Sequence, residues 1–330
     1  PHVGKSSLLN YVMDPARRQA LFGDEFKNDV FQILDAQMLR SVKSQKEFWE
    51  QALGAVAEGL SPDAAKTLAP LRPIYEMAQE NGFGTFVLEQ LFTEAKAKGV
   101  RCMLFLDEFD DLLSHPVLNS AEFYGSLRSL ASRSQGLVLV LGSRRDVEQL
   151  NTLTQAINPH GSPYFNVFTQ ITLKTLTEPA FLDLLGRAGT NFQAQDVDYI
   201  RAVSGRYPFL AQAAAAKLWE ANEDGLQDYA RYEYAGRELY TEAKQHFADT
   251  WRVWTNEFRR AVTTVTLAQI PDLVGNHTFA RGELIKSLDD FAPELETLED
   301  LGLLTQVDEG WIVTQGAFLW WLADELKRNV

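Results

Sequence analysis

The first seven residues combine residue types that bind phosphate. Gly4, Lys5 and Ser6 match the end of the pattern Gly-x-x-x-x-Gly-Lys-Ser/Thr, and an apolar helical stretch follows them. In that pattern the glycine lets the backbone approach the phosphates, the lysine ammonium reaches the β- and γ-phosphates, and the hydroxyl binds Mg²⁺. Backbone N–H groups at the start of the helix add positive charge. The sequence therefore predicts that Val3, Gly4, Lys5, Ser6 and Ser7 bind a nucleotide.

The motif is only partly present, because its first glycine would precede Pro1. A Gly-Lys-Ser tripeptide also occurs by chance at helix starts, so these residues alone leave both interpretations open. We expect the sequence to begin inside the motif, with the strand that normally precedes the loop missing from the sheet.

A second motif lies some hundred residues downstream. Residues 101–110 read Arg-Cys-Met-Leu-Phe-Leu-Asp-Glu-Phe-Asp, a short apolar run that ends in acids. Such a run predicts a strand buried on both faces of a parallel sheet, and ligands bind at the carboxyl ends of the strands in such sheets. Asp107 could hold Mg²⁺ through water, and Glu108 could orient and deprotonate an attacking water. Together with the first motif, these acids indicate a P-loop NTPase.

Charge and composition agree with this interpretation. The 330 residues include 45% hydrophobic and 23% charged residues, which is typical of a globular chain large enough for two or three domains. The net charge of −14 argues against a general nucleic-acid binder. The single cysteine excludes a disulfide within the chain and favours a reducing, cytoplasmic location. No apolar run is long enough to span a membrane, so we expect no membrane association.

An arginine follows the next predicted strand. Residues 136–142 are apolar and bounded by glycine, and Ser143, Arg144, Arg145 and Asp146 come directly after them. A guanidinium at this position could sense the γ-phosphate, because it is a bidentate and permanently charged partner of phosphate oxygens. Arg144 is favoured over Arg145, although a solvated charge cluster would have the same composition.

The remaining elements follow from the apolar periodicity and from proline and glycine positions. In the first half we expect strands at residues 29–35 and 168–173, helices at 45–60, 85–98 and around 123–130, and a loop-rich stretch at 147–170. In the second half we expect helices at 177–185, 196–203, 208–219, 226–254, 258–270, 281–288 and 293–301, and a hairpin of 303–307 with 311–313. The aromatic residues between 229 and 254 have helical spacing, which favours core packing over a ligand or partner surface.

Taken in order, these motifs resemble the AAA+-related STAND ATPases, especially their prokaryotic members. The resemblance rests on Gly-Lys-Ser, on Leu-Phe-Leu-Asp-Glu-Phe-Asp, on Gly-Ser-Arg and on residues 205–210, Gly-Arg-Tyr-Pro-Phe-Leu. It implies an α/β P-loop core at 1–175, a helical lid at 176–254 and a winged-helix domain at 255–330. It also implies ATP or ADP with Mg²⁺ as ligands, and a contact of Pro208 with the adenine. The lid motif here is Gly-x-x-Pro, whereas many relatives have Gly-x-Pro.

The last domain bears on the function. Three helices followed by a hairpin predict a winged helix, and such domains often bind DNA through the third helix. Here that helix is acidic, with Glu294, Glu296, Glu299 and Asp300, which would repel the phosphate backbone. We therefore expect a domain that packs over the nucleotide and holds the off state. His277 could reach a nucleotide, but a lone histidine is more often structural.

Two functions remain open. The first is an ATP-binding, slowly hydrolysing switch of a signalling or defence protein, in which the nucleotide controls the winged helix and the formation of a homo-oligomer. Effector and sensor domains would then lie outside this sequence. The alternative is an AAA+ initiator or loader that acts on DNA. The acidic helix, the overall charge and the lack of any lysine or arginine in residues 147–170 favour the switch.

Overall fold

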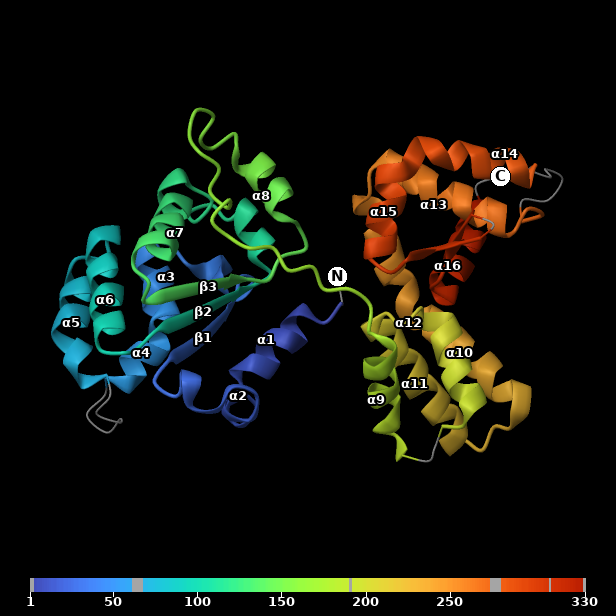
Figure 1. The fold of residues 1–330 in the computed structure, drawn as a ribbon, viewed down its shortest axis with the longest axis horizontal. Helices are drawn as coiled ribbons and strands as arrows, with labels where there is room; N and C mark the ends of the chain where they lie inside the picture. The colour runs from blue at the N-terminus through green and yellow to red at the C-terminus, as the bar shows by residue number, and fades with distance from the viewer. Residues whose placement is uncertain (1–2, 61–67, 190–191, 274–279, 309, 329–330) are drawn as a thin grey trace. The chain divides into compact units, whose positions relative to one another are not determined.

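The computed structural model describes residues 3–60, 68–189, 192–273, 280–308 and 310–328. The chain divides into two compact units, which are described separately. One unit comprises Lys5–Ile171, and the other comprises Thr172–Val330 together with residues 1–4. Figure 1 labels the helices and strands of both units.

The first unit contains a three-stranded parallel sheet with the order β1-β2-β3. The strands are β1 (Val30–Asp35), β2 (Cys102–Asp107) and β3 (Leu137–Leu141). All six residues of β2 are buried, as expected for a central strand with both faces covered. Asp35 pairs with Asp107, and Leu106 pairs with Leu141, so the carboxyl ends of the strands meet at one edge. The three strands confirm the predictions at 29–35, 101–110 and 136–142.

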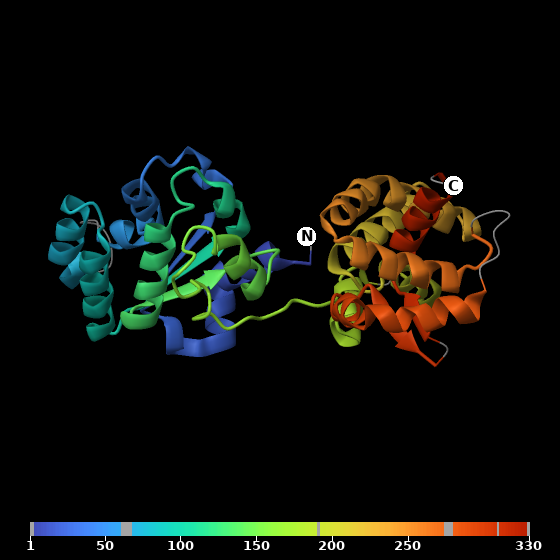
Figure 2. The same ribbon diagram turned by 90° about the horizontal axis from the view of Figure 1, so that it is seen from above.

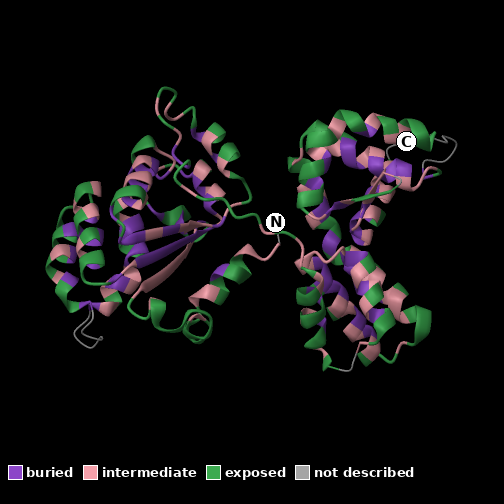
Figure 3. Cartoon of the chain, viewed as in Figure 1, coloured by how far each residue is buried: buried purple, intermediate pink, exposed green. Residues whose placement is uncertain are grey.

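Helices cover both faces of this sheet (Figures 1 and 2). Successive side chains of β2 point to opposite faces: Met103 and Phe105 pack with Leu9 of the first helix, whereas Leu104 and Leu106 belong to the main core. In Figure 3 β2 is accordingly coloured as buried, whereas β1 is coloured as intermediate. The helices of this unit are α1 (Lys5–Met13), α2 (Pro15–Phe22), α3 (Gln45–Ala52), α4 (Gly54–Gly59), α5 (Arg72–Glu80), α6 (Thr85–Ala97), α7 (Ala121–Arg133) and α8 (Val147–Thr154).

Two local predictions differ from the structure. The helix expected at 45–60 is divided into α3 and α4, because Leu53 leaves the helical backbone with φ −102° and ψ 14°. The stretch expected to be loop-rich begins with the helix α8. Asp146 caps this helix, since its carboxylate accepts a hydrogen bond of 2.7 Å from the Gln149 N–H.

The prediction of a strand at 168–173 is wrong. These residues form no strand, and no strand of the described chain pairs with them. The apolar residue at the centre of the segment, Ile171, is 83% exposed. The segment crosses the boundary between the two units, so it lacks the neighbouring strand and the buried face that would stabilise extended pairing.

The second unit is helical with one antiparallel hairpin. Its helices are α9 (Glu178–Gly186), α10 (Ala194–Ser204), α11 (Pro208–Glu223), α12 (Asp228–Val253), α13 (Asn256–Gln269), α14 (Arg281–Ser287), α15 (Ala292–Asp300) and α16 (Gly316–Arg328), and its strands are β4 (Leu304–Val307) and β5 (Gly310–Val313). The elements agree with those predicted for the second half, and α16 follows the hairpin.

One hydrophobic cluster runs through this whole unit. It joins Leu218 and Phe247, which precede residue 255, to Val262, Leu298 and Phe318, which follow it. The rings of Phe247 and Phe318 lie edge to face with centroids 5.4 Å apart. The division into a lid at 176–254 and a further domain at 255–330 stays a prediction. Among the described helices of either unit, none has the length and apolar character needed to cross a bilayer.

Candidate functional site

Asp107 lies buried at the carboxyl end of β2. Its Oδ1 accepts a hydrogen bond of 2.9 Å from the Glu108 N–H. Gly142, which follows β3, leaves the space for this carboxylate: a Cβ at Gly142 would lie 2.7 Å from Asp107 Oδ1. The Asp107 carboxylate can therefore occupy this position at the sheet edge only because residue 142 has no side chain.

The start of α1 belongs to the same region of the first unit. Leu9 lies against Gly142, with its Cδ1 3.3 Å from the position of a Cβ there, and it packs on Met103 and Phe105. Lys5, Ser6 and Ser7 form the turn of α1 before Leu9, and both serines are exposed. Gly4 has φ 97°, a conformation that favours glycine. The first turn of α1 thus lies directly before Leu9, the residue that packs against Gly142 at the Asp107 edge.

Glu108 has the left-handed backbone conformation, with φ 48° and ψ 40°. This conformation is uncommon for a residue with a side chain and is often maintained at functional sites by surrounding contacts. Here the Phe109 N–H donates to the Gly142 carbonyl at 2.8 Å, and Phe109 is fully buried. The chain then enters the 3-10 helix η4 (Phe109–Ser114). The hydrogen bond from Phe109 to Gly142 therefore anchors the turn that begins at Glu108.

Arg144 connects the acids that follow β2. Its Nε lies 2.8 Å from Asp110 Oδ2 and 3.3 Å from Glu108 Oε2, and its Nη2 lies 2.7 Å from Asp111 Oδ1. Burial alone would lower the pKa of this guanidinium, but the charge of Asp110 and its hydrogen bond, followed by the charges of Glu108 and Asp111, raise the pKa. Arg144 is therefore a fixed positive charge at the end of β3.

Oxygen atoms of Glu108, Asp110 and Asp111 lie within 4.8 Å of one another. Carboxylates at such distances could hold a metal ion, but all three contact Arg144, whose positive charge offsets part of theirs. The predicted magnesium ligands are instead Asp107 and Ser6. A buried carboxylate beside the space that Gly142 leaves fits a hard cation that prefers oxygen ligands. The assignment of both ligands stays a prediction.

Sequence reasoning missed the contributions of Asp110, Asp111 and Ser143. Asp110 Oδ1 accepts from the Arg144 N–H at 3.1 Å and from Ser143 Oγ at 3.4 Å. A signal was present, because acids at 107, 108, 110 and 111 follow one strand and two arginines follow its neighbour. Both arginines are exposed, and Arg144 is the one that contacts Glu108.

Pro208, the predicted adenine contact, lies in the second unit as the first residue of α11. Gly205 of the same motif ends α10 with φ 55°, and a Cβ there would lie 2.8 Å from Gln315 Cγ and 3.0 Å from the Thr314 carbonyl carbon. The motif is therefore packed against the turn before α16. The role of Pro208 stays a prediction, and His277 lies outside the described residues.

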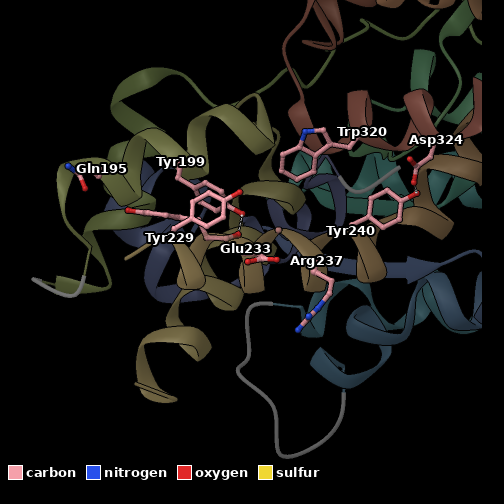
Figure 4. A pocket seen from close by; sticks show the side chains of 10 residues that line it. Gln195, Tyr199, Tyr229, Glu233, Arg237, Tyr240, Trp320 and Asp324 are labelled. Atoms are coloured by element: carbon pink, nitrogen blue, oxygen red, sulfur yellow. Dashed lines mark hydrogen bonds between the residues drawn. The ribbon is translucent and has the colours of Figure 1, made fainter. Parts of the chain in front are cut away.

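The predicted aromatic stripe is partly core and partly surface. Phe247 is buried, but Tyr229 is 76% exposed. Several of these tyrosines line an open groove of about 710 Å³ in the second unit (Figure 4). Its floor is Gly236, where a Cβ would lie 3.1 Å from Tyr199 Oη and 3.6 Å from the Trp320 ring.

Three tyrosines of this groove, Tyr199, Tyr232 and Tyr240, donate their hydroxyl groups within the protein. Tyr199 donates to the Tyr232 carbonyl at 3.0 Å, Tyr232 donates to Asp196 at 2.8 Å, and Tyr240 donates to Asp324 at 2.9 Å. Burial raises the pKa of Tyr199 to about 12, so its hydroxyl stays protonated at neutral pH. The groove therefore presents ring surface, and its lining includes none of the residues predicted to bind nucleotide.

Comparison with known proteins decides the family. The family model described as "Novel STAND NTPase 2" matches residues 1–269. The chain belongs to this STAND NTPase family. The match includes the start of α1, the acids after β2 and Arg144. None of the curated proteins compared with this STAND NTPase matches it.

Solved structures agree on the fold. The Walker-type ATPase PABY2304 of Pyrococcus abyssi is 13% identical with a TM-score of 0.51, covering 97% of this chain and 88% of its own. The Aeropyrum pernix ORC2 protein in ADPNP-ADP complexes is 13% identical with a TM-score of 0.51, covering 99% and 85%. The Aeropyrum pernix ORC1 protein in complex with DNA is 14% identical, with a TM-score of 0.41, covering 100% and 86%.

Proposed function

We propose that this STAND NTPase is an ATP-binding and slowly hydrolysing switch of a signalling or defence protein. The observation that carries the proposal is the meeting of Asp107, Glu108 and Arg144 at the carboxyl edge of the sheet, where Leu9 of α1 also packs. This edge combines an oxygen ligand, a candidate base and a candidate phosphate sensor. The Aeropyrum pernix ORC2 protein, a fold relative whose structure was determined in ADPNP-ADP complexes, supports a nucleotide as the ligand.

The phosphates would bind at the start of α1. Backbone N–H groups from Val3 to Ser7 and the Lys5 ammonium would neutralise the phosphate charge, and the Gly4 backbone would permit close approach. Ser6 and Asp107 would hold Mg²⁺, which supplies Lewis acidity and compensates charge at the transferred phosphoryl group. The exposed Ser6 and Ser7 hydroxyls support this role, since no packing requires them.

Glu108 would act as the general base. Its carboxylate would accept a proton from the water that attacks the γ-phosphate. The left-handed turn at Glu108 supports different tasks for these two adjacent acids. Arg144 contacts Glu108 directly, so a change in the bond of Arg144 to phosphate would alter the surroundings of the base.

The second unit would read out the nucleotide. We infer that α13–α15 and the β4–β5 hairpin form a winged helix, and that α9–α12 form the lid. Pro208 would contact the adenine. Gly205 of the same motif packs against residues 314 and 315, so this contact could affect the segment before α16. Exchange of ADP for ATP would then change the position of this unit and permit a homo-oligomer to form. Effector and sensor domains would be supplied by other parts of a longer, cytoplasmic protein.

The alternative is an AAA+ initiator or loader that acts on DNA. The likeness to the ORC proteins is one of fold and leaves this possibility open. The surface of α15 opposes it, because Glu296, Glu299 and Asp300 are exposed. Such a surface repels a phosphate backbone. Nucleic acid is therefore an unlikely partner of this helix.

The test compares nucleotide binding, hydrolysis and size in the full-length protein and its Lys5→Ala variant. Size-exclusion profiles are recorded in ADP and in a non-hydrolysable ATP analogue, each with Mg²⁺. Assembly in the ATP analogue that is lost in Lys5→Ala supports the switch. Binding that depends on Lys5 without any change in size, together with duplex DNA affinity that falls steeply with salt, would favour the initiator.

A further inference from the structure

Both carboxylate oxygens of Asp110 accept hydrogen bonds from residues 143 and 144, the segment that carries the predicted phosphate sensor. Oδ2 pairs with Arg144 Nε at 2.8 Å, while Oδ1 accepts from the Arg144 N–H at 3.1 Å and from Ser143 Oγ at 3.4 Å. Its side chain is only 6% exposed. A buried carboxylate with charge-assisted bonds holds a guanidinium firmly, because separation would leave the carboxylate desolvated and unpaired.

Asp111 completes the contact from a second side. Its Oδ1 lies 2.7 Å from Arg144 Nη2, and its Oδ2 lies 3.4 Å from Nη2 of the largely exposed Arg40. Between them, Asp110 and Asp111 occupy the Nε and Nη2 edge of the Arg144 guanidinium. This edge is one of those that a guanidinium uses to bind two phosphate oxygens at once.

We propose that Asp110 is a positioning residue that holds Arg144 against Glu108 when no γ-phosphate is bound, and so sets the preference between ADP and ATP. The inference rests on the function proposed above. Asp110 and a γ-phosphate compete for the same edge of the guanidinium. ADP lacks the third phosphate and leaves the contact intact, whereas ATP must break it. Binding of ATP is therefore weakened, because the Asp110–Arg144 ion pair must be separated first.

The first measurement is the ratio of dissociation constants for ADP and a non-hydrolysable ATP analogue in Asp110→Asn. The amide keeps the shape and an acceptor oxygen but removes the charge. We expect the ATP analogue to bind about tenfold more tightly and the affinity for ADP to change less than about twofold, as charge-assisted bonds are roughly twice as strong as neutral ones. Equal changes for both nucleotides, or weaker binding of the ATP analogue, would overturn the proposal.

The second measurement needs no nucleotide. Arg144 and Arg145 are adjacent, and the Arg144 side chain is 41% exposed, so solvent access alone would not protect it from phenylglyoxal. We expect peptide mass spectrometry to find Arg145 modified much faster than Arg144 in the parent protein. Asp110→Asn should reduce this difference at least fivefold. Equal modification of both arginines in the parent would contradict the contact.

Asp29→Asn is the matched control. Asp29 is also a buried carboxylate, 3% exposed, and it likewise accepts from the backbone N–H and the guanidinium of one arginine, Arg101. Asp29 and Arg101 directly precede β1 and β2, so this pair lies at the amino-terminal ends of the strands, opposite to the carboxyl edge. The control should lose stability without a change in the ADP-to-ATP ratio. If no variant binds any nucleotide, the proposed function fails while the labelling still tests the contact. If binding occurs but the ratio is unchanged in Asp110→Asn, only the positioning role fails.

Discussion

The Nε of Arg144 lies 3.3 Å from Oε2 of Glu108, so the predicted sensor and the predicted base touch each other. The two residues follow neighbouring parallel strands, and the anchored turn at Glu108 brings its carboxylate to the arginine. A change at either residue therefore has consequences for the other.

Glu108→Gln should retain nucleotide but stop hydrolysis. The amide cannot accept the proton of the attacking water, and general-base catalysis contributes about 10²- to 10⁴-fold to such rates. Phosphate release and nucleotide affinity are measured on the same preparation. Glu122→Gln, on an exposed position of α7, serves as the control. Hydrolysis by Glu108→Gln at the parental rate would show that another group is the base.

Lys5→Ala should abolish nucleotide binding. The ammonium at the start of α1 has the predicted role of neutralising the β- and γ-phosphates, and alanine keeps the helix intact. Isothermal titration with ADP and with the ATP analogue measures the loss. Lys27→Ala removes an exposed lysine that pairs only with the exposed Asp24 among described residues, and it should bind as the parent does.

Arg144→Ala should bind nucleotide without switching. Loss of the guanidinium also leaves the buried Asp110 carboxylate without its charged partner, which we expect to cost about 1–3 kcal/mol of unfolding free energy. Chemical denaturation measures the stability, and size-exclusion profiles in each nucleotide measure the switch. Arg145→Ala should change neither the stability nor the nucleotide-dependent size. If ATP-dependent assembly persisted in Arg144→Ala, Arg144 would not be required for the switch.

Gly142→Ala should displace the Asp107 carboxylate. The new Cβ would lie 2.7 Å from Oδ1, closer than a carbon and an oxygen can approach, so the strand or the side chain must move. We expect a loss of about 1–3 kcal/mol in stability and a weaker dependence of nucleotide affinity on Mg²⁺. Gly186→Ala provides the comparison, because no atom of the described residues lies within 4 Å of a Cβ at the end of α9.

Cys102 should resist alkylation in the folded protein. Burial in β2 raises the pKa of its thiol to about 12, so the fraction of thiolate at pH 8 is about one in ten thousand. Reaction with iodoacetamide then requires local or global opening of the first unit. The measured rate should rise with denaturant and fall when nucleotide is added. Fast reaction under native conditions would contradict the burial of β2.

The sheet was predictable because its strands are short apolar runs bounded by turns and acids. The residues of β2 need no context to be assigned as buried. Residues 168–173 also contain apolar residues, but a strand requires a neighbour, and the sequence does not reveal whether one is available. The helix α8 was missed because its short periodic segment, begun by Asp146, precedes a stretch rich in turn residues.

The site was predictable in its residue types but not in its pairing. The acids after β2 and the arginine after β3 were identified from their order along the chain. That Arg144 contacts Asp110, Asp111 and Glu108 depends on the left-handed turn at Glu108 and on the contact of Phe109 with Gly142. Tertiary hydrogen bonds determine these side-chain directions, and local propensity does not encode them.

The core shared by the helices on either side of residue 255 limits how this protein can be dissected. A fragment that ended at Val253 would expose Phe247 and the other apolar side chains that Phe318 and Trp321 cover. Such a fragment would aggregate and would report nothing about an isolated lid. Chimeras with relatives should exchange residues 172–330 as a whole, because a junction inside them would combine two halves of a core that were not selected together.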